Sequence, residues 1–413
     1  MMDAYYDYFI IGGGIAGVTA AETIRSRDAD GSIAILSDEV HPLYSRVLLP
    51  AYLKGRIARD RIFLRIVDDY AAKKIDFYPD TEVVAVDVSG HIVKTADNRI
   101  FHFGKLLIAS GGKVKRWEHD EAASPHSYRL QTIDDADRLV RDMSGIRVPL
   151  VIGASFIALE LIEIFLHHKI IPQVMSEASG FFGAFADTEG SGILEQNFKR
   201  LGVSCVFDQK IVGCHKSGEE YAITMVGGDT LRTDAFAVGI GIERSRDFLS
   251  GSGITLGRRG VKVNEYLESD MIGIYSAGDI AEYYDVVSDE YRTAGNWTNA
   301  ILQGTRAGLN MTGERLAFTH IPSYGITNCG MQIVMIGECG GEGMSAITRS
   351  GGSGVEYERL FTRRGIIVGA FLINRFQDRT LVTDLISRRV DVSAYEYQLH
   401  DMAFDINVII KIK

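Results

Sequence analysis

Three glycines near the N-terminus, Gly12, Gly14 and Gly17, follow the apolar run YDYFII and precede the helical pattern IAGVTAAETIRSR. At this spacing the first glycine makes a tight turn, the second lets the backbone approach a pyrophosphate, and the third lets helix and strand pack closely. The next apolar run, SIAIL, ends at Asp38 and Glu39, about 20 residues beyond Gly17, where a carboxylate accepts hydrogen bonds from ribose hydroxyls. Strand, turn, helix and acid together predict a dinucleotide site.

A second stretch, VIGASFIALELIE, repeats the pattern with Gly153 in place but with Ser155 and Ala158 at the later glycine positions. Alanine at the third position is within the accepted pattern, whereas serine puts a Cβ where the backbone meets the pyrophosphate. The serine hydroxyl can itself donate to a phosphate. Glu177 ends the following strand and no arginine comes after it, which favours NADH over NADPH. Two hypotheses stay open: this unit binds NADH, or it is structural only.

Two later segments identify the first dinucleotide. KLLIASGGK closes on Ser110 and Gly111, and MIGIYSAGDIAEYYD runs into Gly278 and Asp279. These segments resemble the ATG and GD motifs of FAD enzymes built like glutathione reductase, in which the aspartate holds the flavin ribitol. The resemblance implies that FAD occupies the first fingerprint. The alternative for Asp279 alone is a helix N-cap.

The segment HPLYSRVLLPAYLKG narrows the resemblance. It is similar to the PY-x-R segment of rubredoxin reductases, ferredoxin reductases and the N-terminal part of NAD(P)H-nitrite reductase large subunits, which implies that Arg46 lies near the flavin. Ferredoxin reductases that serve oxygenases often carry a lysine after this segment, paired with a helix glutamate. Ala51 takes that position here, so rubredoxin and nitrite reductases are the nearer kin. The same resemblance implies that Glu160 lies near the nicotinamide.

Two further segments match the same group of reductases. AGNWTNAILQGTRAG resembles the helix that lies against the flavin pyrimidine, which makes Trp297 a candidate FAD contact and a core aromatic its alternative. AFAVGIGIERS resembles the strand that closes the nicotinamide domain, with Gly239 and Gly241 as candidate NAD contacts. No confident catalytic side chain follows from these matches, and Glu160 and Arg46 are the candidates.

The cysteines argue against disulfide chemistry. The four are Cys205, Cys214, Cys329 and Cys339, with no C-x-x-C pair to indicate zinc or a thioredoxin-like site. Disulfide reductases and cysteine-type NADH oxidases place a redox cysteine in the N-terminal part, and disulfide exchange needs a thiolate. No cysteine precedes Cys205, so we exclude these classes and expect structural thiols.

Composition limits the partners. The chain has 413 residues, 46% hydrophobic and 24% charged, with a net charge of −10. Two or three domains are expected at this length, and the negative charge argues against nucleic acid as a partner. No apolar run approaches the roughly 18 residues of a membrane span, and the N-terminus lacks the pattern of a signal peptide. We expect a cytoplasmic protein, monomer or homodimer, without metal.

The remaining pattern completes the expected architecture. After Gly313 short strands such as MQIVMIGE and IIVGAFLIN alternate with glycine-rich turns, which is typical of an antiparallel sheet. The resemblance implies an α/β fold of two Rossmann-like domains plus a small α+β C-terminal interface domain. The expected boundaries are residues 1–113 and 246–314 for FAD, 114–245 for NAD(H), and 315–413 for the interface domain.

The function implied by this resemblance is hydride transfer from NADH to FAD, followed by electron release to a small rubredoxin- or ferredoxin-like carrier protein. Arg363, Arg364, Arg388 and Arg389 could attract an acidic carrier, or they are simply solvated turns and helix ends. Two alternatives to the carrier reductase stay open. One is a flavin-bearing electron-transfer subunit of a larger, nitrite-reductase-like complex, and the other is a flavoprotein with a vestigial nicotinamide site.

Overall fold

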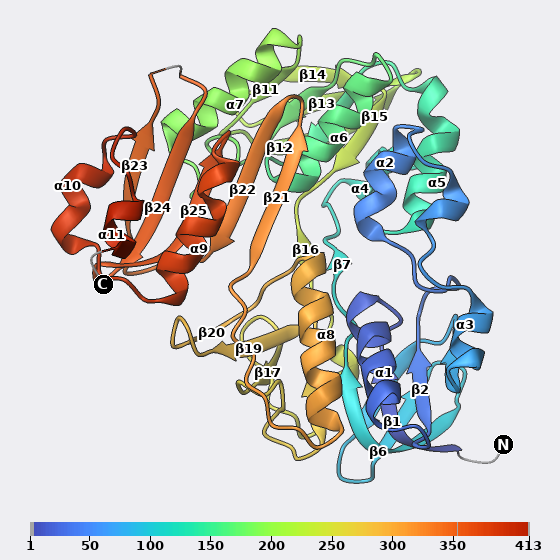
Figure 1. Cartoon of the computed structure of the whole chain (residues 1–413). Coiled ribbons are helices and arrows are strands. Elements are labelled where there is room, and N and C mark those ends of the chain that lie inside the picture. The colour runs from blue at the N-terminus through green and yellow to red at the C-terminus, as the bar shows by residue number, and fades with distance from the viewer. Residues whose placement is uncertain (1–3, 353, 412–413) are drawn as a thin grey trace. The chain divides into compact units, whose positions relative to one another are not determined.

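The computed structural model describes residues 4–352 and 354–411. Its chain forms two compact units, each assembled from separate stretches of sequence. The first unit contains Met1–Leu48, Ile57–Lys113 and Ile242–Pro322, and the second contains Leu49–Arg56, Val114–Gly241 and Ser323–Lys413. Figure 1 labels the elements of both.

The first unit is built on a seven-stranded sheet in the order β3-β2-β1-β6-β5-β4, with β18 paired to β6. Its parallel strands are β1 (Ala4–Ile11), β2 (Ile33–Leu36), β3 (Ile75–Tyr78), β6 (Ile100–Ile108) and β18 (Ile274–Ser276). Strand β5 (Ile92–Thr95) pairs antiparallel with β6 on one side and with β4 (Val83–Asp87) on the other. Ile11 is in register with both Leu36 and Ile108. The carboxyl ends of these strands therefore meet at one edge, where ligands of open α/β sheets bind.

Helix α1 (Ile15–Arg27) follows β1, and α8 (Trp297–Met311) packs against it (Figure 1). Gly304 makes this close approach possible, because a Cβ there would overlap the Ala16 carbonyl oxygen. A small sheet of β17 (Val261–Val263), β19 (Ala281–Asp285) and β20 (Glu290–Arg292) completes the unit. Helix α8, from the last stretch of sequence in this unit, thus packs beside α1 and the first fingerprint turn.

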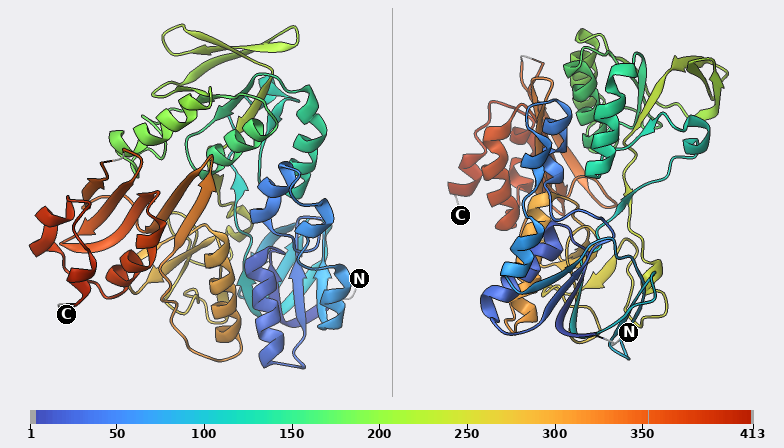
Figure 2. Two further views of the ribbon diagram at one scale, coloured as in Figure 1. Left: turned by 45° about the horizontal axis from the view of Figure 1, so that its top comes forward. Right: turned by 90° about the vertical axis from the view of Figure 1, so that its right-hand side faces the viewer.

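The second unit contains a five-stranded parallel sheet in the order β11-β10-β9-β15-β8. The strands are β8 (Ser127–Tyr128), β9 (Pro149–Ile152), β10 (Gln173–Met175), β11 (Ser204–Val206) and β15 (Ala235–Val238). The helices of this part are α5 (Ile133–Asp142), α6 (Phe156–His167) and α7 (Thr188–Arg200). A separate antiparallel sheet of β12 (Ile211–Ser217), β13 (Glu220–Met225) and β14 (Thr230–Thr233) is visible in Figure 2.

The C-terminal part of the second unit is a five-stranded antiparallel sheet in the order β21-β22-β25-β24-β23. Its strands are β21 (Ser323–Asn328), β22 (Met331–Gly337), β23 (Ser345–Ser350), β24 (Tyr357–Arg363) and β25 (Ile366–Ile373), followed by α9 (Arg379–Ser387), α10 (Glu396–Leu399) and α11 (Asn407–Lys411).

Other short helices and strands of the two units are α2 (Leu49–Leu53), α3 (Val67–Ala72), α4 (Asp120–Ala123), β7 (Lys113–Val114) and β16 (Ile242–Glu243). The predicted fold class is confirmed, and the predicted domain boundaries stay predictions.

None of the helices within residues 4–352 and 354–411 is both long and apolar enough to cross a membrane.

A buried ion pair fixes the C-terminal sheet to the segment that follows it. Arg349 on β23 and Glu358 on β24 lie 3.3 Å apart, with side chains 1% and 0% exposed. The Arg349 guanidinium also donates to the carbonyls of Met402 and Phe404, at 2.8 and 3.0 Å. One side chain thus ties two strands and residues 402–404 together.

We expect Arg349→Met to lower the free energy of unfolding by about 3 kcal/mol, because it removes one of the two cations beside the buried Glu358 carboxylate, leaving Arg375 at 3.4 Å, and also the bonds to the Met402 and Phe404 carbonyls. Urea denaturation gives the value. The matched control is Arg388→Met, which breaks an exposed pair with Asp384 on α9 and should cost about 0.5 kcal/mol or less. Equal losses in the two variants would contradict this account of the buried pair.

Candidate functional site

The first fingerprint forms an open turn between β1 and α1. Gly12 has φ +118°, and a Cβ there would overlap the Ala109 carbonyl oxygen. A Cβ at Gly17 would overlap the Gly12 carbonyl oxygen, whereas the space beside Gly14 is empty to 4 Å. Gly14 caps α1 without a side-chain hydrogen bond. The first N–H groups of the helix are therefore available to an anion such as a pyrophosphate.

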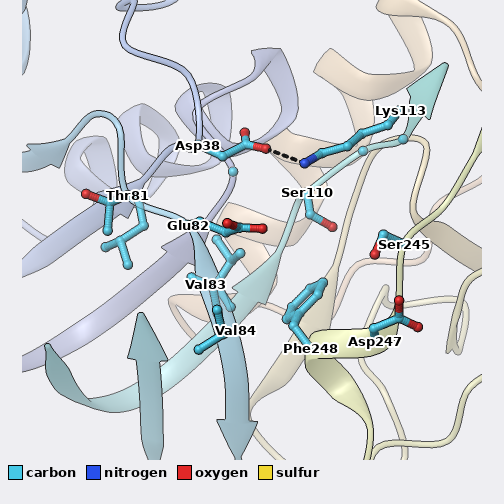
Figure 3. A pocket seen from close by; sticks show the side chains of 15 residues that line it. Asp38, Thr81, Glu82, Val83, Val84, Ser110, Lys113, Ser245, Asp247 and Phe248 are labelled. Atoms are coloured by element: carbon cyan, nitrogen blue, oxygen red, sulfur yellow. Dashed lines mark ion pairs between the residues drawn. The ribbon is translucent and has the colours of Figure 1, made fainter. Parts of the chain in front are cut away.

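A cavity of about 330 Å³ opens at the carboxyl edge of the same sheet. Its size is at the lower end of ligand pockets, near 300 Å³, enough for part of a dinucleotide. Figure 3 shows Asp38 and Lys113 pointing toward each other across it, and their charged atoms lie 3.1 Å apart. The lining residues are Ile11, Gly12, Leu36, Asp38, Thr81, Glu82, Val83, Val84, Ser110, Gly111, Gly112, Lys113, Ser245, Asp247 and Phe248.

The two acids after β2 have different surroundings. Asp38 lines the cavity, where it forms an ion pair with Lys113. Glu39 accepts a hydrogen bond of 2.5 Å from the Tyr44 hydroxyl and forms an ion pair with Arg46. Of the two acids, Asp38 is thus the one that lines the cavity, and Glu39 orients Arg46; a ribose contact of either acid stays a prediction.

Asp279 follows β18 at the same edge, and no helix begins after it, because the next element is β19. The N-cap interpretation of Asp279 is therefore wrong. Burial raises the pKa of its carboxyl, while Arg244 and Arg46 act in the opposite direction. Within the part of the chain that the structure describes, no hydrogen bond reaches this carboxylate. It is free to accept hydrogen bonds from the hydroxyls of a ligand.

Helix α8 supports this turn. The Gln303 side-chain oxygen accepts a hydrogen bond of 2.7 Å from the Gly278 backbone N–H, and Gln303 is fully buried. Trp297 begins α8 and packs, half-buried, against the apolar core of the first unit. Both roles proposed for Trp297, core aromatic and flavin contact, are compatible with this position.

The second fingerprint repeats the same backbone geometry between β9 and α6. Gly153 has φ +121°, and a Cβ there would overlap the Gly239 carbonyl oxygen. Ser155 caps α6 in an extended conformation (φ −120°, ψ −169°), close to that of Gly14 (φ −74°, ψ −177°), and its side chain makes no capping bond. The serine therefore leaves the turn intact, and its hydroxyl is available beside the helix N-terminus.

The other predicted NAD contacts lie around this turn. Ala158 is fully buried, and a Cβ on Gly239 would lie 3.1 Å from the Ala158 nitrogen. Glu177 follows β10 and is exposed, and Gly241 lies two residues beyond Gly239 after β15. Their roles in binding stay predictions.

Comparison with known proteins identifies the family. The family model described as pyridine nucleotide-disulphide oxidoreductase matches residues 6–304. The chain belongs to this family. Its membership confirms the predicted oxidoreductase class and the predicted cofactors, FAD and NAD(H).

Three similar proteins show the range of relatives. The epsilon subunit of NADH-dependent phenylglyoxylate dehydrogenase from Aromatoleum evansii is 24% identical, over 94% of this chain and 92% of the relative. The ferredoxin–NAD(+) reductase component of 3-phenylpropionate/cinnamic acid dioxygenase from Photorhabdus laumondii is 25% identical, over 93% and 97%. The reductase fold in a crystal structure of the covalent putidaredoxin reductase–putidaredoxin complex matches with a TM-score of 0.89 at 22% identity, over 99% of each chain.

For a pyridine nucleotide-disulphide oxidoreductase, the first unit has the features that FAD needs. A bare helix N-terminus suits the pyrophosphate, Asp38 lines a cavity of about 330 Å³, and the Asp279 carboxylate receives no hydrogen bond from the described residues. Arg244 lies beside Asp279 and donates to its backbone carbonyl. Lys113 and Arg244 were missed from the sequence, although each stands directly after a motif, SGG and GIGIE.

A lysine close to the position of Ala51 pairs with a glutamate of the second fingerprint helix. Lys54, just after α2 and three residues beyond Ala51, forms an ion pair with Glu163 on α6. Its partner in this pair is Glu163 and not Glu160, the glutamate singled out from the sequence. The kinship inferred from Ala51 stays a prediction.

None of the four cysteines forms a disulfide in the described part of the chain, and burial raises the pKa of Cys205 and Cys329 to about 12. At neutral pH these sulfurs are thiols, which are poor nucleophiles. We expect Cys329→Ala to change the rate of flavin reduction by NADH by less than about twofold, as followed by stopped-flow absorbance. A loss of reduction would show that this thiol takes part.

Proposed function

We propose that this chain is an FAD-dependent NADH oxidoreductase that passes electrons to a small one-electron carrier protein of the ferredoxin or rubredoxin class. The observation that carries the proposal is the pair of fingerprint turns, one in each unit, both with the backbone geometry that binds a pyrophosphate. Relatives named as a ferredoxin–NAD(+) reductase component and as a putidaredoxin reductase match over 93% and 94% of this chain. The proposed function accounts for two nucleotide sites without a reactive cysteine.

In this proposal bound FAD supplies the redox chemistry, since a flavin accepts a hydride and releases electrons singly. The chain supplies position. Gly12 and Gly14 open the turn to the FAD pyrophosphate, Asp38 accepts from its ribose, and Asp279 accepts from the ribityl chain. Arg46, held by Glu39, adds positive charge on the flavin side of the turn. Ser110, Gly111 and Gly278 keep the backbone close to the cofactor.

The second turn takes the nicotinamide nucleotide. Gly153 and Ser155 meet the pyrophosphate, with the hydroxyl of Ser155 as an additional donor. Glu177 accepts from the adenosine ribose and repels a 2′-phosphate, and residues 170–187 contain no lysine or arginine to bind one. NADH is therefore the proposed donor rather than NADPH. Glu160, on the helix that begins at this turn, is placed toward the nicotinamide ring.

The four arginines suggested from the sequence lie on two neighbouring segments, and two of them are paired with carboxylates. The turn after β24 hydrogen-bonds to the segment after α9, with 2.8 Å from the Val392 nitrogen to the Gly365 oxygen. Arg363 is paired with Glu338, and Arg388 with Asp384. These two pairs reduce the attraction of this surface for an acidic carrier.

A second candidate function is an electron-transfer subunit of a larger enzyme. It is favoured by the match to a dehydrogenase epsilon subunit over 94% of this chain. Purification from the native source under mild conditions separates the two functions, because a subunit elutes with partner chains and a carrier reductase does not. The cytoplasmic location and the oligomeric state stay predictions.

The test of the leading function is turnover with a purified carrier. FAD-loaded protein is mixed with NADH and an oxidised ferredoxin or rubredoxin, and reduction of the carrier is followed by its own absorbance. The proposal predicts carrier reduction that needs both NADH and FAD. Reduction of the flavin without any transfer to either carrier would contradict the carrier-reductase function and favour the subunit.

A further inference from the structure

We infer that Glu163 is a positioning residue that holds Lys54 away from Glu160, so that the Glu160 carboxylate stays available to the positively charged ring of NAD⁺. The inference rests on the proposed function, because it takes the nicotinamide ring to lie at the Glu160 position of α6. It adds a charge-based preference for the oxidised nucleotide over the reduced one.

Lys54 is committed to Glu163 in this structure. Its side chain is 7% exposed, that of Glu163 is 18% exposed, and the two form an ion pair. The other Glu163 oxygen accepts a hydrogen bond of 3.2 Å from the Cys329 backbone N–H. The His168 ring, at the end of α6, lies 2.7 Å from the Leu53 carbonyl oxygen and fixes the end of α2 beside the helix. One Glu163 oxygen is thus fixed by the Cys329 N–H while the other pairs with Lys54.

Glu160 lies one helical turn before Glu163, on the same face of α6. It is half-buried, and among residues 4–352 and 354–411 no hydrogen bond reaches its carboxylate. Lys54 therefore acts electrostatically on two carboxylates, and of these two it forms its ion pair with Glu163. Burying a carboxylate without an ion-pair partner costs free energy. We therefore infer that a positive charge on the bound ligand pairs with Glu160.

The surroundings of Glu160 set the pH at which its charge appears. Burial raises its pKa to about 6, with Lys54 and Arg56 lowering it and Glu163 raising it. Tyr324 and Cys329 are its other titratable neighbours, and burial raises the pKa of each to about 12, so both stay neutral. Glu160 is therefore protonated below about pH 6 and negatively charged above it.

The ring of the nucleotide changes charge in the reaction. Loss of a hydride, two electrons and one proton, converts the neutral dihydropyridine of NADH into the pyridinium cation of NAD⁺. A carboxylate beside the ring attracts the cation and has little effect on the neutral ring. The ionised Glu160 thus stabilises the product side of hydride donation, and this effect is lost if Lys54 turns to Glu160.

Binding to the FAD-loaded protein tests this directly. NAD⁺ and 1,4,5,6-tetrahydro-NAD, whose ring is uncharged and cannot donate a hydride, are titrated calorimetrically between about pH 5 and about pH 8. For the wild type we expect affinity for NAD⁺ to rise roughly tenfold through a transition near pH 6, with little change for the analogue. Glu160→Gln removes the transition.

Two substitutions move the transition in opposite directions. Glu163→Gln removes a negative charge and frees Lys54 to pair with Glu160, so the transition moves to lower pH and the gain in NAD⁺ affinity across it becomes smaller. The amide oxygen still accepts the Cys329 N–H, which protects folding. Lys54→Gln removes the cation, so the transition moves to higher pH. The matched control, Glu195→Gln on an exposed position of α7, keeps the wild-type transition.

The outcomes separate this inference from the function on which it rests. A transition that stays at one pH in both Glu163→Gln and Lys54→Gln overturns the positioning role, as does binding of NAD⁺ that is independent of pH while both nucleotides bind. If neither nucleotide binds the wild type at any pH, the proposed nicotinamide site is wrong and the inference falls with it. A purely structural Glu163 lowers thermal stability without moving the transition.

Discussion

Asp279→Ala is expected to yield a protein that loses its flavin during purification. The Asp279 carboxylate has no hydrogen bond from the described protein, so its acceptor capacity is left for the cofactor, and Arg46 and Arg244 both favour its charged form. Hydrogen bonds to a charged group contribute roughly 1.5–3 kcal/mol each, so losing two of them weakens FAD binding by roughly 100-fold or more. The ratio of flavin to protein absorbance after desalting, and FAD titration of the apoprotein, give the effect.

The controls for this prediction come from the same segment. Asp279→Asn keeps one acceptor oxygen and should retain part of the flavin. Asp289→Ala removes an exposed aspartate of the turn after β19, whose carboxylate accepts a hydrogen bond from the Tyr284 hydroxyl, and should leave flavin content unchanged. Full flavin content in Asp279→Ala would mean that the ribityl chain is bound elsewhere.

The second large effect is expected at Gly153. Alanine at φ +121° is strained, and its Cβ would overlap the Gly239 carbonyl oxygen, so the turn that receives the nucleotide must shift. We expect Gly153→Ala to slow flavin reduction by NADH by roughly 100-fold, since a displacement of about 1 Å in a binding turn costs that much. FAD content should be unchanged, because the FAD fingerprint is in the other unit. Single-turnover rates at increasing NADH concentration measure the loss.

Ser155→Gly is the informative companion of Gly153→Ala. It restores the usual glycine without altering the backbone, since the extended conformation of Ser155 is open to either residue. We expect a change of less than about fivefold, in the direction of weaker binding, from the loss of one hydroxyl donor. Wild-type reduction rates in Gly153→Ala would show instead that the second turn does not bind the nucleotide.

Local patterns made much of this fold predictable. The glycines at 12 and 153 follow from the geometry of a strand–turn–helix unit, and the structure shows at both positions that a side chain would collide with a neighbouring strand end. The C-terminal strands were also predictable, because apolar runs of strand length alternate with glycine-rich turns. In these cases neighbours in sequence determine the conformation.

Long-range pairing was not predictable. The alanine at position 51 indicated that a lysine was missing there, whereas the structure pairs Lys54, after α2, with Glu163 on α6, a partner that no local pattern specifies. Asp279 could be distinguished from a helix cap only once a strand was seen to follow it. The pairing of Asp38 with Lys113 depends on which strands are neighbours in the sheet. Contacts of this kind can be predicted only when the fold is known, because residues far apart in sequence form them.

Anaerobic mixing of the FAD-loaded protein with NADH in a stopped-flow instrument tests the central claim most directly. The account predicts that the visible absorption of the oxidised flavin disappears within seconds, faster with NADH than with NADPH. A flavin that stays oxidised with both nucleotides, yet is reduced by dithionite, would contradict it. That result would leave the second fingerprint as a structural unit and the flavin as a group reduced by another protein.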